Sequence, residues 1–228
     1  MRPRVLVSWS SGKDSAWMLH QLRQRDDIEI VGLLTTMNEA FGRVAMHAVR
    51  RELLAAQAEA AGLPLTEVPL PWPCSNEEYE RRMTAAVEAA RAAGVTHVAF
   101  GDLFLEEIRA YREQKMADTG LAPLFPLWGL DTARLARQMM AGGLRARLTT
   151  VDPRQLRPGF VGREFDPRLL FELPDKVDPC GERGEFHTFC YDGPMFRHPV
   201  AFESGAVVER DGFVFADLVP CTPSASSA

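Results

Sequence analysis

Cysteine is scarce in this chain of 228 residues, which contains only four. Cys74, Cys180, Cys190 and Cys221 form no C-x-x-C pair and do not have the spacing of a zinc finger. This argues against a disulfide framework and against a structural zinc site. We therefore expect four free thiols in a reducing cytosol.

Long hydrophobic runs and an excess of positive charge are also missing. No apolar stretch approaches the roughly 20 residues that a membrane helix needs, and no charged-then-apolar leader opens the chain. The net charge of -5 gives no general basic field for nucleic acid. We expect a cytoplasmic protein with neither a membrane nor nucleic acid as its partner, and the sequence leaves a homodimer open.

The first half of the chain instead alternates short apolar runs with amphipathic segments. The apolar runs predict strands, and the segments after them have helical spacing. The expected strands lie at residues 5–8, 28–34, 65–68 and 95–101, and the later helices at 46–61, 75–93, 105–118 and 131–141. Repeated units of this kind predict an α/β fold with a doubly wound, mostly parallel sheet.

The pattern changes after Gly142–Gly143. Apolar and polar residues alternate over residues 144–149, which predicts a strand with one wet face, and Asp211–Gly212 predicts a hairpin turn. We expect a nucleotide-binding domain over residues 1–142 and a smaller, β-rich substrate-binding domain over 143–222. Residues 223–228 are expected to form a disordered tail.

Small and polar residues between the first strand and the first helix suggest a phosphate site. A helix start presents unpaired N–H groups and a positive dipole end, and Ser10, Ser11, Lys13 and Ser15 add donors and charge. Gly12 lets the backbone approach a phosphate closely. The competing interpretation is a serine-rich turn that only caps an ordinary helix.

This loop is neither a Walker A loop nor a dinucleotide fingerprint. A Walker A loop has a glycine where Val7 stands and a Ser or Thr where Asp14 stands, and G-x-G-x-x-G is absent. What remains is S-x-G-K-D-S directly after a strand, which resembles the PP-loop of the N-type ATP pyrophosphatases. Ser11 stands where that loop commonly has a glycine.

A second candidate cluster follows the strand at 95–101. Asp102 comes at the carboxyl end of this strand, where ligands bind in doubly wound sheets, and could hold magnesium or cap the next helix. Arg109 and Arg112 are about one turn apart and could grip an anion together. The alternative is a solvated helix face with ion pairs of the Glu106–Arg109 type.

A third cluster surrounds a glycine-rich turn. Glu182 and Glu185 flank Gly184, and Glu185 shares a strand face with His187. These groups could bind magnesium, orient an amine or carry protons. A metal site of Cys180, Glu182 and His187 is conceivable, although its spacing matches no zinc pattern. The alternative is a polar turn that leads into a strand.

One further histidine precedes the second helix. His47 would face the same end of the sheet as the phosphate loop if it lies near the start of that helix. A single histidine on an amphipathic helix is more often structural than catalytic.

These segments occur in an order that resembles a known family. The loop at 10–15, Gly101–Asp102, residues 126–128, Val151–Asp152 and Cys180–Glu185 together resemble the diphthine–ammonia ligases, a branch of the N-type ATP pyrophosphatases. The resemblance extends to about Pro194 and implies a HUP-type, adenine nucleotide alpha hydrolase-like fold. It also implies adenylation of a substrate carboxylate by ATP, release of pyrophosphate, and displacement of AMP by ammonia.

The resemblance implies the following site. Lys13, Glu182 and Glu185 would be catalytic, and Asp14 and Asp102 would hold Mg²⁺. His47, Arg109, Arg112 and His187 would bind substrate. ATP would be bound by Ser8, Ser10, Ser11, Gly12, Lys13, Asp14, Ser15, Thr35, Gly101 and Asp102.

Two departures and two alternatives remain. Arg183 replaces the first glycine of the family's E-G-G-E, and His187 stands where these ligases often have an acid, so the acceptor is left open beyond a carboxylate on a small molecule or a modified protein side chain. A tRNA-thiolating PP-loop enzyme would use Cys180 or Cys190 as a reactive thiol. A nucleotide-binding sensor would keep the loop without turnover.

Overall fold

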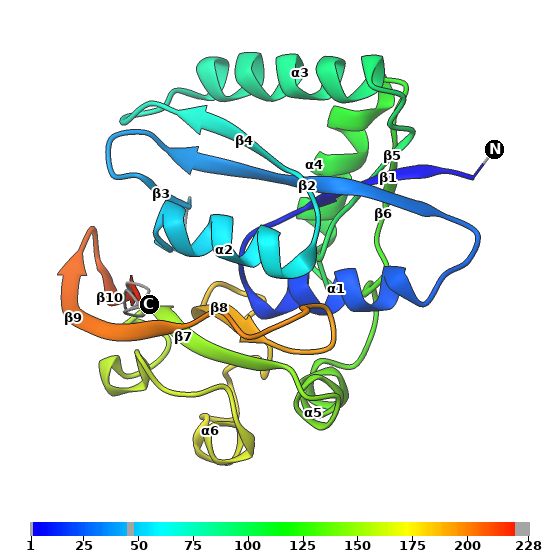
Figure 1. The fold of residues 1–228 in the computed structure, drawn as a ribbon. Helices are drawn as coiled ribbons and strands as arrows, with labels where there is room; N and C mark the ends of the chain where they lie inside the picture. Colours follow the sequence, from blue (N-terminus) through cyan, green and yellow to red (C-terminus); the bar gives the residue numbers. More distant parts are fainter. Residues whose placement is uncertain (1, 45–47, 222–228) are drawn as a thin grey trace, which may run out of the picture.

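Two β-sheets and the helices around them make up the computed structural model, which describes residues 2–44 and 48–221 (Figure 1). The first sheet has the order β3-β2-β1-β5-β6, and β4 also pairs with β2. Its pairings are parallel except for the short β2–β3 pair, as the repeated strand-helix pattern predicted. Its strands are β1 (Arg4–Ser8), β2 (Glu29–Asn38), β3 (Arg43–Val44), β4 (Leu65–Leu70), β5 (His97–Ala99) and β6 (Ala122–Leu124).

Helices cover both faces of this sheet, so the sheet is doubly wound (Figure 1). One apolar cluster joins Leu6 of β1 to α3 and α4, and a second joins Val5 and Val7 of the same strand to α1 and α2. The alternation follows from the period of two in a strand that is buried on both sides. The helices are α1 (Lys13–Arg23), α2 (Arg51–Ala61), α3 (Asn76–Ala92), α4 (Glu106–Ala117), α5 (Thr132–Ala141) and α6 (Pro167–Glu172).

The second sheet is antiparallel and has the order β8-β7-β10-β9. It packs directly against the start of α1. The backbone N–H of Cys190 donates to the carbonyl of Ser11 at 2.9 Å, and the N–H of Lys13 donates to Oγ1 of Thr188 at 3.1 Å. Its strands are β7 (Arg145–Val151), β8 (Phe186–Asp192), β9 (Phe202–Arg210) and β10 (Phe213–Pro220).

The same apolar cluster that packs α1 and α2 on β1 continues into the second sheet through Leu148 and Phe189. The two halves of the chain therefore share one core. The division into domains at residue 142 remains a prediction.

Side-chain caps mark the starts of α3 and α5. Asp131 accepts from the N–H of Arg134 at 2.7 Å and caps α5. Ser75 caps α3 by accepting from the N–H of Glu78. The Glu78 carboxylate in turn accepts from the guanidinium groups of Arg81 and Arg82, which are stronger partners than a backbone N–H.

The strands differ more from expectation. The strand expected over 95–101 is only β5, and the wet face expected for β7 is incomplete because Thr149 is buried. The hairpin at Asp211–Gly212 is confirmed, since both residues have the positive φ that a tight turn between two strands needs. The tail expected over 223–228 lies outside the described residues.

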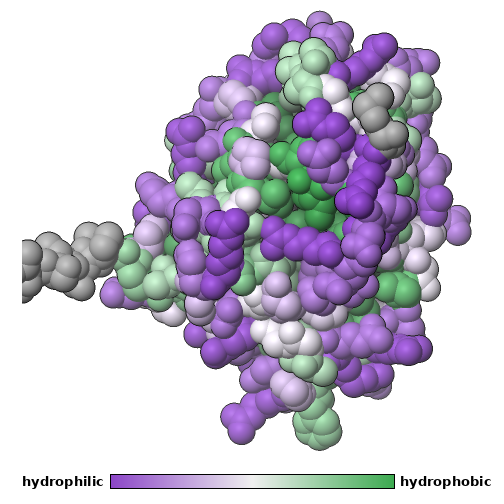
Figure 2. All heavy atoms as spheres, turned by 45° about the vertical axis from the view of Figure 1, so that its right-hand side comes forward, coloured by the Kyte–Doolittle hydropathy of each residue, from purple (hydrophilic) through white to green (hydrophobic). Residues whose placement is uncertain are grey.

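Polar side chains cover most of the face drawn in Figure 2, and apolar side chains gather in a hollow near its middle. Within the part of the chain that the structure describes, no helix combines the length and the apolar character needed to cross a bilayer.

Candidate active site

The loop between β1 and α1 is shaped by hydrogen bonds among its own residues. Gly12 is the N-cap of α1, and its N–H donates to Oγ of Ser10 at 3.3 Å. Oγ of Ser15 donates to the carbonyl of Gly12 at 3.0 Å. Ser11 has a φ of 69°, a conformation that glycine adopts without strain, which explains why a glycine is common at this position of the loop.

Lys13 is buried within this loop and is held by the Asp14 carboxylate, a backbone carbonyl and two aromatic rings. Its side chain is 2% exposed, and Nζ forms an ion pair with Oδ2 of Asp14 at 2.7 Å and donates to the carbonyl of Cys180. Nζ also lies 5.5 Å from the ring centres of Phe165 and Phe186. Burial opposes the charge, but the neighbouring Asp14 carboxylate raises the pKa of Lys13, so the ammonium is retained.

Two buried carboxylates shape the loop over residues 178–185. The first is Asp178, whose Oδ1 accepts from the N–H groups of Cys180 at 2.9 Å and Glu182 at 3.2 Å. Its Oδ2 accepts from the hydroxyl of Thr132 at 2.6 Å, which ties the loop to α5. Asp178 therefore aims the Cys180 carbonyl that holds Lys13.

The second buried carboxylate is Glu185, which is 1% exposed. Its Oε1 accepts from the N–H of Asp178 at 2.8 Å, and its Oε2 accepts from the N–H of Arg183 at 2.9 Å. Both oxygens are thus used to close the turn. The structure supports a positioning role for Glu185 better than the catalytic role expected from the sequence.

Glu182, by contrast, is turned toward the phosphate loop. Its Oε1 accepts from the N–H of Leu103, at 2.7 Å, which connects the loop after β5 with the loop before β8. Burial, with a smaller contribution from the charges of Asp14 and Asp102, raises the pKa of Glu182 to about 7. At neutral pH this group can therefore both accept and donate a proton.

A cavity of about 380 Å³ brings these parts together. Its size is within the range of small-molecule sites. The expected site residues that line it are Ser8, Ser10, Lys13, Asp14, Ser15, Thr35, Gly101, Asp102, Arg112, Glu182 and His187. Those that do not line it are Ser11, Gly12, Arg109 and Glu185. His47 lies outside the described residues.

The two arginines of α4 have different surroundings. Arg112 lines the cavity and donates to both oxygens of Asp102 at 2.6 and 3.2 Å. Arg109 pairs with Glu113 and lies over the rings of Phe125 and Trp128. A joint grip on one anion is therefore not what this arrangement favours.

Sequence reasoning missed an apolar wall of the cavity. Tyr79, Met83 and Val87 line it from α3 at spacings of four residues, together with Phe100 and Met116. The spacing was visible in the sequence as one face of a helix, but such a stripe indicates ordinary core packing just as well. Only the structure shows that part of this face borders a cavity.

Two buried oxygen atoms in the cavity wall have no hydrogen-bond partner among the described residues. They are Oδ1 of Asp14 and Oγ1 of Thr35. Buried polar atoms are normally paired, so both atoms are candidate contacts for a ligand. The alternative metal site of Cys180, Glu182 and His187 is not formed: within the described ranges no three His, Cys, Asp or Glu side chains could hold an ion together.

Neither candidate thiol has the surroundings of a reactive one. Burial raises the pKa of the Cys180 thiol and of the Cys190 thiol, so both stay protonated at neutral pH. Sγ of Cys180 donates to the carbonyl of Thr132 at 3.4 Å. Nothing in these contacts favours a thiol-based reaction.

Comparisons with known proteins agree over most of the chain. The family model for the diphthamide synthase N-terminal domain matches residues 3–123, and that for the C-terminal domain matches residues 131–213. A diphthine–ammonia ligase of Danio rerio is 27% identical over 243 aligned positions, which cover 94% of this chain and 92% of that protein. One of Bos taurus is 25% identical and covers 94% and 88%. One of Homo sapiens is 28% identical over 64% of this chain and 56% of that protein.

Proposed function

Because this chain belongs to the diphthamide synthase family, we propose that it is an ATP-dependent ligase that joins ammonia or another amine to a substrate carboxylate. One observation carries the proposal: the same cavity is lined by Lys13 of the loop at residues 10–15 and by Glu182, whose pKa is raised. The positive charge of Lys13 suits a polyphosphate, and the carboxylate of Glu182 suits a proton transfer. Adenylation would need the first group, and attack by the amine would need the second.

The proposed function implies one orientation of ATP in this cavity. The β- and γ-phosphates would lie at the start of α1, where the first turn leaves N–H groups without partners inside the helix and Lys13 adds a positive charge. The adenine would lie against the apolar wall from Tyr79 to Val87. This arrangement leaves the α-phosphorus between the loop and Glu182.

The chemistry follows from that orientation. An oxygen of the substrate carboxylate attacks the α-phosphorus, the bond to the bridging oxygen breaks, and pyrophosphate leaves with the electron pair. Lys13 and the loop N–H groups stabilise the charge that develops on the pyrophosphate. The amine then attacks the acyl carbon, AMP leaves, and ionised Glu182 accepts the proton that the nitrogen loses.

The donor set also suits Mg²⁺. Mg²⁺ is usually held by one or two carboxylates together with substrate phosphates, and the unpartnered Oδ1 of Asp14 is such a ligand next to the phosphate loop. Asp102 is less suited, because Arg112 already occupies both of its oxygens. A bound Mg²⁺ would supply further charge stabilisation for the leaving pyrophosphate.

Product analysis tests the proposal. The protein is incubated with ATP, Mg²⁺, ammonium and a panel of carboxylic acids, and the nucleotide products are separated. We expect AMP and pyrophosphate; ADP and phosphate alone would overturn the adenylation step. Tight ATP binding without turnover on any acid would instead support a sensor.

The Lys13→Ala variant sharpens this test. Loss of one preorganised charge at the leaving group lowers turnover by about 100- to 1000-fold in comparable sites. Lys115 is a matched control, since it is an exposed lysine on α4 that pairs with Glu80 at the surface. Lys115→Ala should leave AMP formation unchanged. Circular dichroism must show that Lys13→Ala is folded, and full turnover of a folded Lys13→Ala would remove Lys13 from the site.

A further inference from the structure

A second cavity, of about 220 Å³, adjoins the first one. Val44 and His187 line both, so these two side chains lie in the wall between them. The second cavity lies where the β9–β10 hairpin faces the carboxyl end of β2, the side toward which the arrows of β2 and β4 point (Figure 1). A molecule bound there would therefore be next to a nucleotide in the first cavity.

Four large aromatic side chains line this second cavity. Phe41 and Trp72 approach it from the first sheet, with ring centres 5.9 Å apart, and Phe213 and Phe215 approach it from β10, with ring centres 6.4 Å apart. Trp72 is 58% exposed and Phe41 is 44% exposed. Large aromatic side chains that are left this exposed around a cavity are typical of a binding site for an apolar group.

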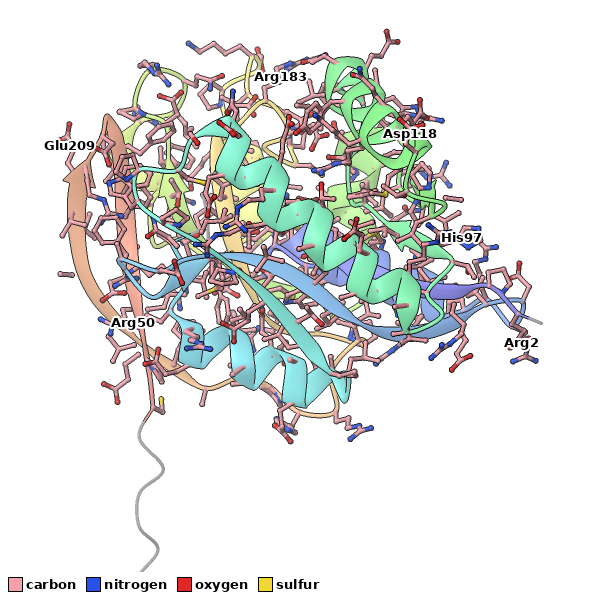
Figure 3. All side chains as sticks on the ribbon, turned by 90° about the horizontal axis from the view of Figure 1, so that it is seen from above. Arg2, Arg50, His97, Asp118, Arg183 and Glu209 are labelled. Atoms are coloured by element: carbon pink, nitrogen blue, oxygen red, sulfur yellow. The ribbon has the colours of Figure 1, made fainter. Side chains whose placement is uncertain are left out.

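The charged side chains at this cavity indicate the charge of the ligand that it would bind. Arg43 lines it and contacts the carboxylate of Asp217 at 2.8 Å, and Arg50 contacts the same carboxylate, so two guanidinium groups share one negative charge. Arg210 is different: its guanidinium lies over the rings of Phe41 and Phe215, at 4.8 and 5.2 Å. Its only ion pair among the described residues is a loose, exposed contact of 3.8 Å with Asp211. The cavity thus offers a cation to an incoming anion, on the side of the molecule where Figure 3 labels Arg50 and Glu209.

We propose that this second cavity is the acceptor subsite, and that it binds a small carboxylic acid with a planar, apolar body. The body lies among the four rings, the carboxylate points past His187 toward the nucleotide, and Arg210 attracts the acid into the cavity. This inference rests on the proposed function, which requires a carboxylate beside the α-phosphorus.

A binding measurement tests the proposed acceptor subsite independently of turnover. Phenylacetate, acetate and phenethylamine are titrated by calorimetry into the full chain in the presence of a nonhydrolysable ATP analogue. Phenylacetate has both the ring and the acid, acetate lacks the ring, and phenethylamine replaces the acid with a cation. We expect phenylacetate to bind at least about tenfold more tightly than either of the others. Equal binding of acetate, tighter binding of phenethylamine, or no binding of phenylacetate would overturn the proposal.

Two variants locate the binding. Trp72→Ala and Arg210→Ala should each weaken phenylacetate binding by about tenfold, without a change in the affinity for the ATP analogue. Phe171→Ala is the matched control, since Phe171 is 91% exposed on α6 and lines neither cavity. Unchanged phenylacetate affinity in both Trp72→Ala and Arg210→Ala would place the acid elsewhere.

The two proposals fail in different ways. If the acid binds as described but no acid yields AMP, the ligase function is wrong and the subsite stands. If acids without a planar body yield AMP at undiminished rate, and Trp72→Ala changes nothing, the subsite is wrong and the ligase function stands.

Discussion

The loop at residues 10–15 and the loop at 178–185 line the same cavity but obtain their shapes in different ways. The first combines contacts between close neighbours, such as Ser10 to Gly12 and Ser15 to Gly12, with hydrogen bonds to Cys190 and Thr188 of the second sheet. The second is wrapped around the buried carboxylates of Asp178 and Glu185, and Thr132 fixes it from α5. The role of the first loop could therefore be inferred from its amino-acid sequence more directly than the role of the second loop.

The second loop shows why residue type alone is a weak guide to a carboxylate's role. Glu182 and Glu185 are three residues apart and were given the same role from the sequence. In the structure Glu185 uses both oxygens to accept backbone N–H groups, whereas Glu182 lines the cavity with a raised pKa. The difference is decided by which backbone N–H groups each side chain meets.

Among the changes that test this contrast between Glu182 and Glu185, replacement of Glu185 should have the largest effect. Glu185→Ala leaves the buried N–H groups of Asp178 and Arg183 without their acceptor, and each costs roughly 1–3 kcal/mol. We expect the free energy of unfolding, measured by urea denaturation, to fall by about 3 kcal/mol. Glu185→Gln keeps one acceptor oxygen and should lose about half as much. If Glu185→Ala keeps its stability but loses turnover, the residue is catalytic after all.

Replacement of Glu182 should change the pH dependence more than the stability. With a pKa of about 7, the ionised fraction of Glu182 rises about tenfold between pH 6 and pH 8. The rate of amide formation at a fixed concentration of free ammonia should rise by about the same factor, and Glu182→Gln should be slow and flat. A wild-type profile without this limb would exclude Glu182 as the proton acceptor.

The raised pKa of Glu182 also predicts how the stability of the fold changes with pH. The pKa of Glu182 is higher in the folded chain than its ordinary value of 4.5, so the fold favours the protonated form. Its effect on stability is therefore most favourable below pH 4.5 and is lost as the pH rises toward 7. The difference in stability between wild type and Glu182→Gln, followed by denaturation from pH 4.5 to 7, should shrink or change sign accordingly.

The smallest effect concerns the first loop. Ser11 combines a positive φ with a buried Oγ that has no partner among the described residues. Ser11→Gly relieves both costs, and Ser11→Ala relieves only the second. We expect Ser11→Gly to raise the free energy of unfolding by about 1 kcal/mol, with Ser11→Ala in between and AMP formation unchanged in both. A destabilised Ser11→Gly would show that the serine side chain supports the loop.

Much of the fold was predictable because its signals are local. The apolar runs of β1 and β2, the Asp131 cap and the Asp211–Gly212 turn depend on a few adjacent residues. Residues of the cavity were predictable where they follow such a signal, as at Lys13, or belong to a motif of the resembled family, as at Asp102 and Glu182. The cavity walls from α3 and from the β9–β10 hairpin could not be inferred, because an apolar helix face or a hairpin has the same sequence pattern whether it borders a core or a ligand.

The amino-acid sequence by itself determined the order of strands and helices, the small and polar loop at the start of α1 and the set of polar residues available for chemistry. The tertiary structure alone decided that β8 lies against that loop and that the carbonyl of Cys180 holds the ammonium of Lys13 across 167 residues of chain. It also decided which carboxylate closes a turn and which lines a cavity. The physical reason is that burial and hydrogen-bond partners depend on distant segments, whereas propensity and capping depend on neighbours.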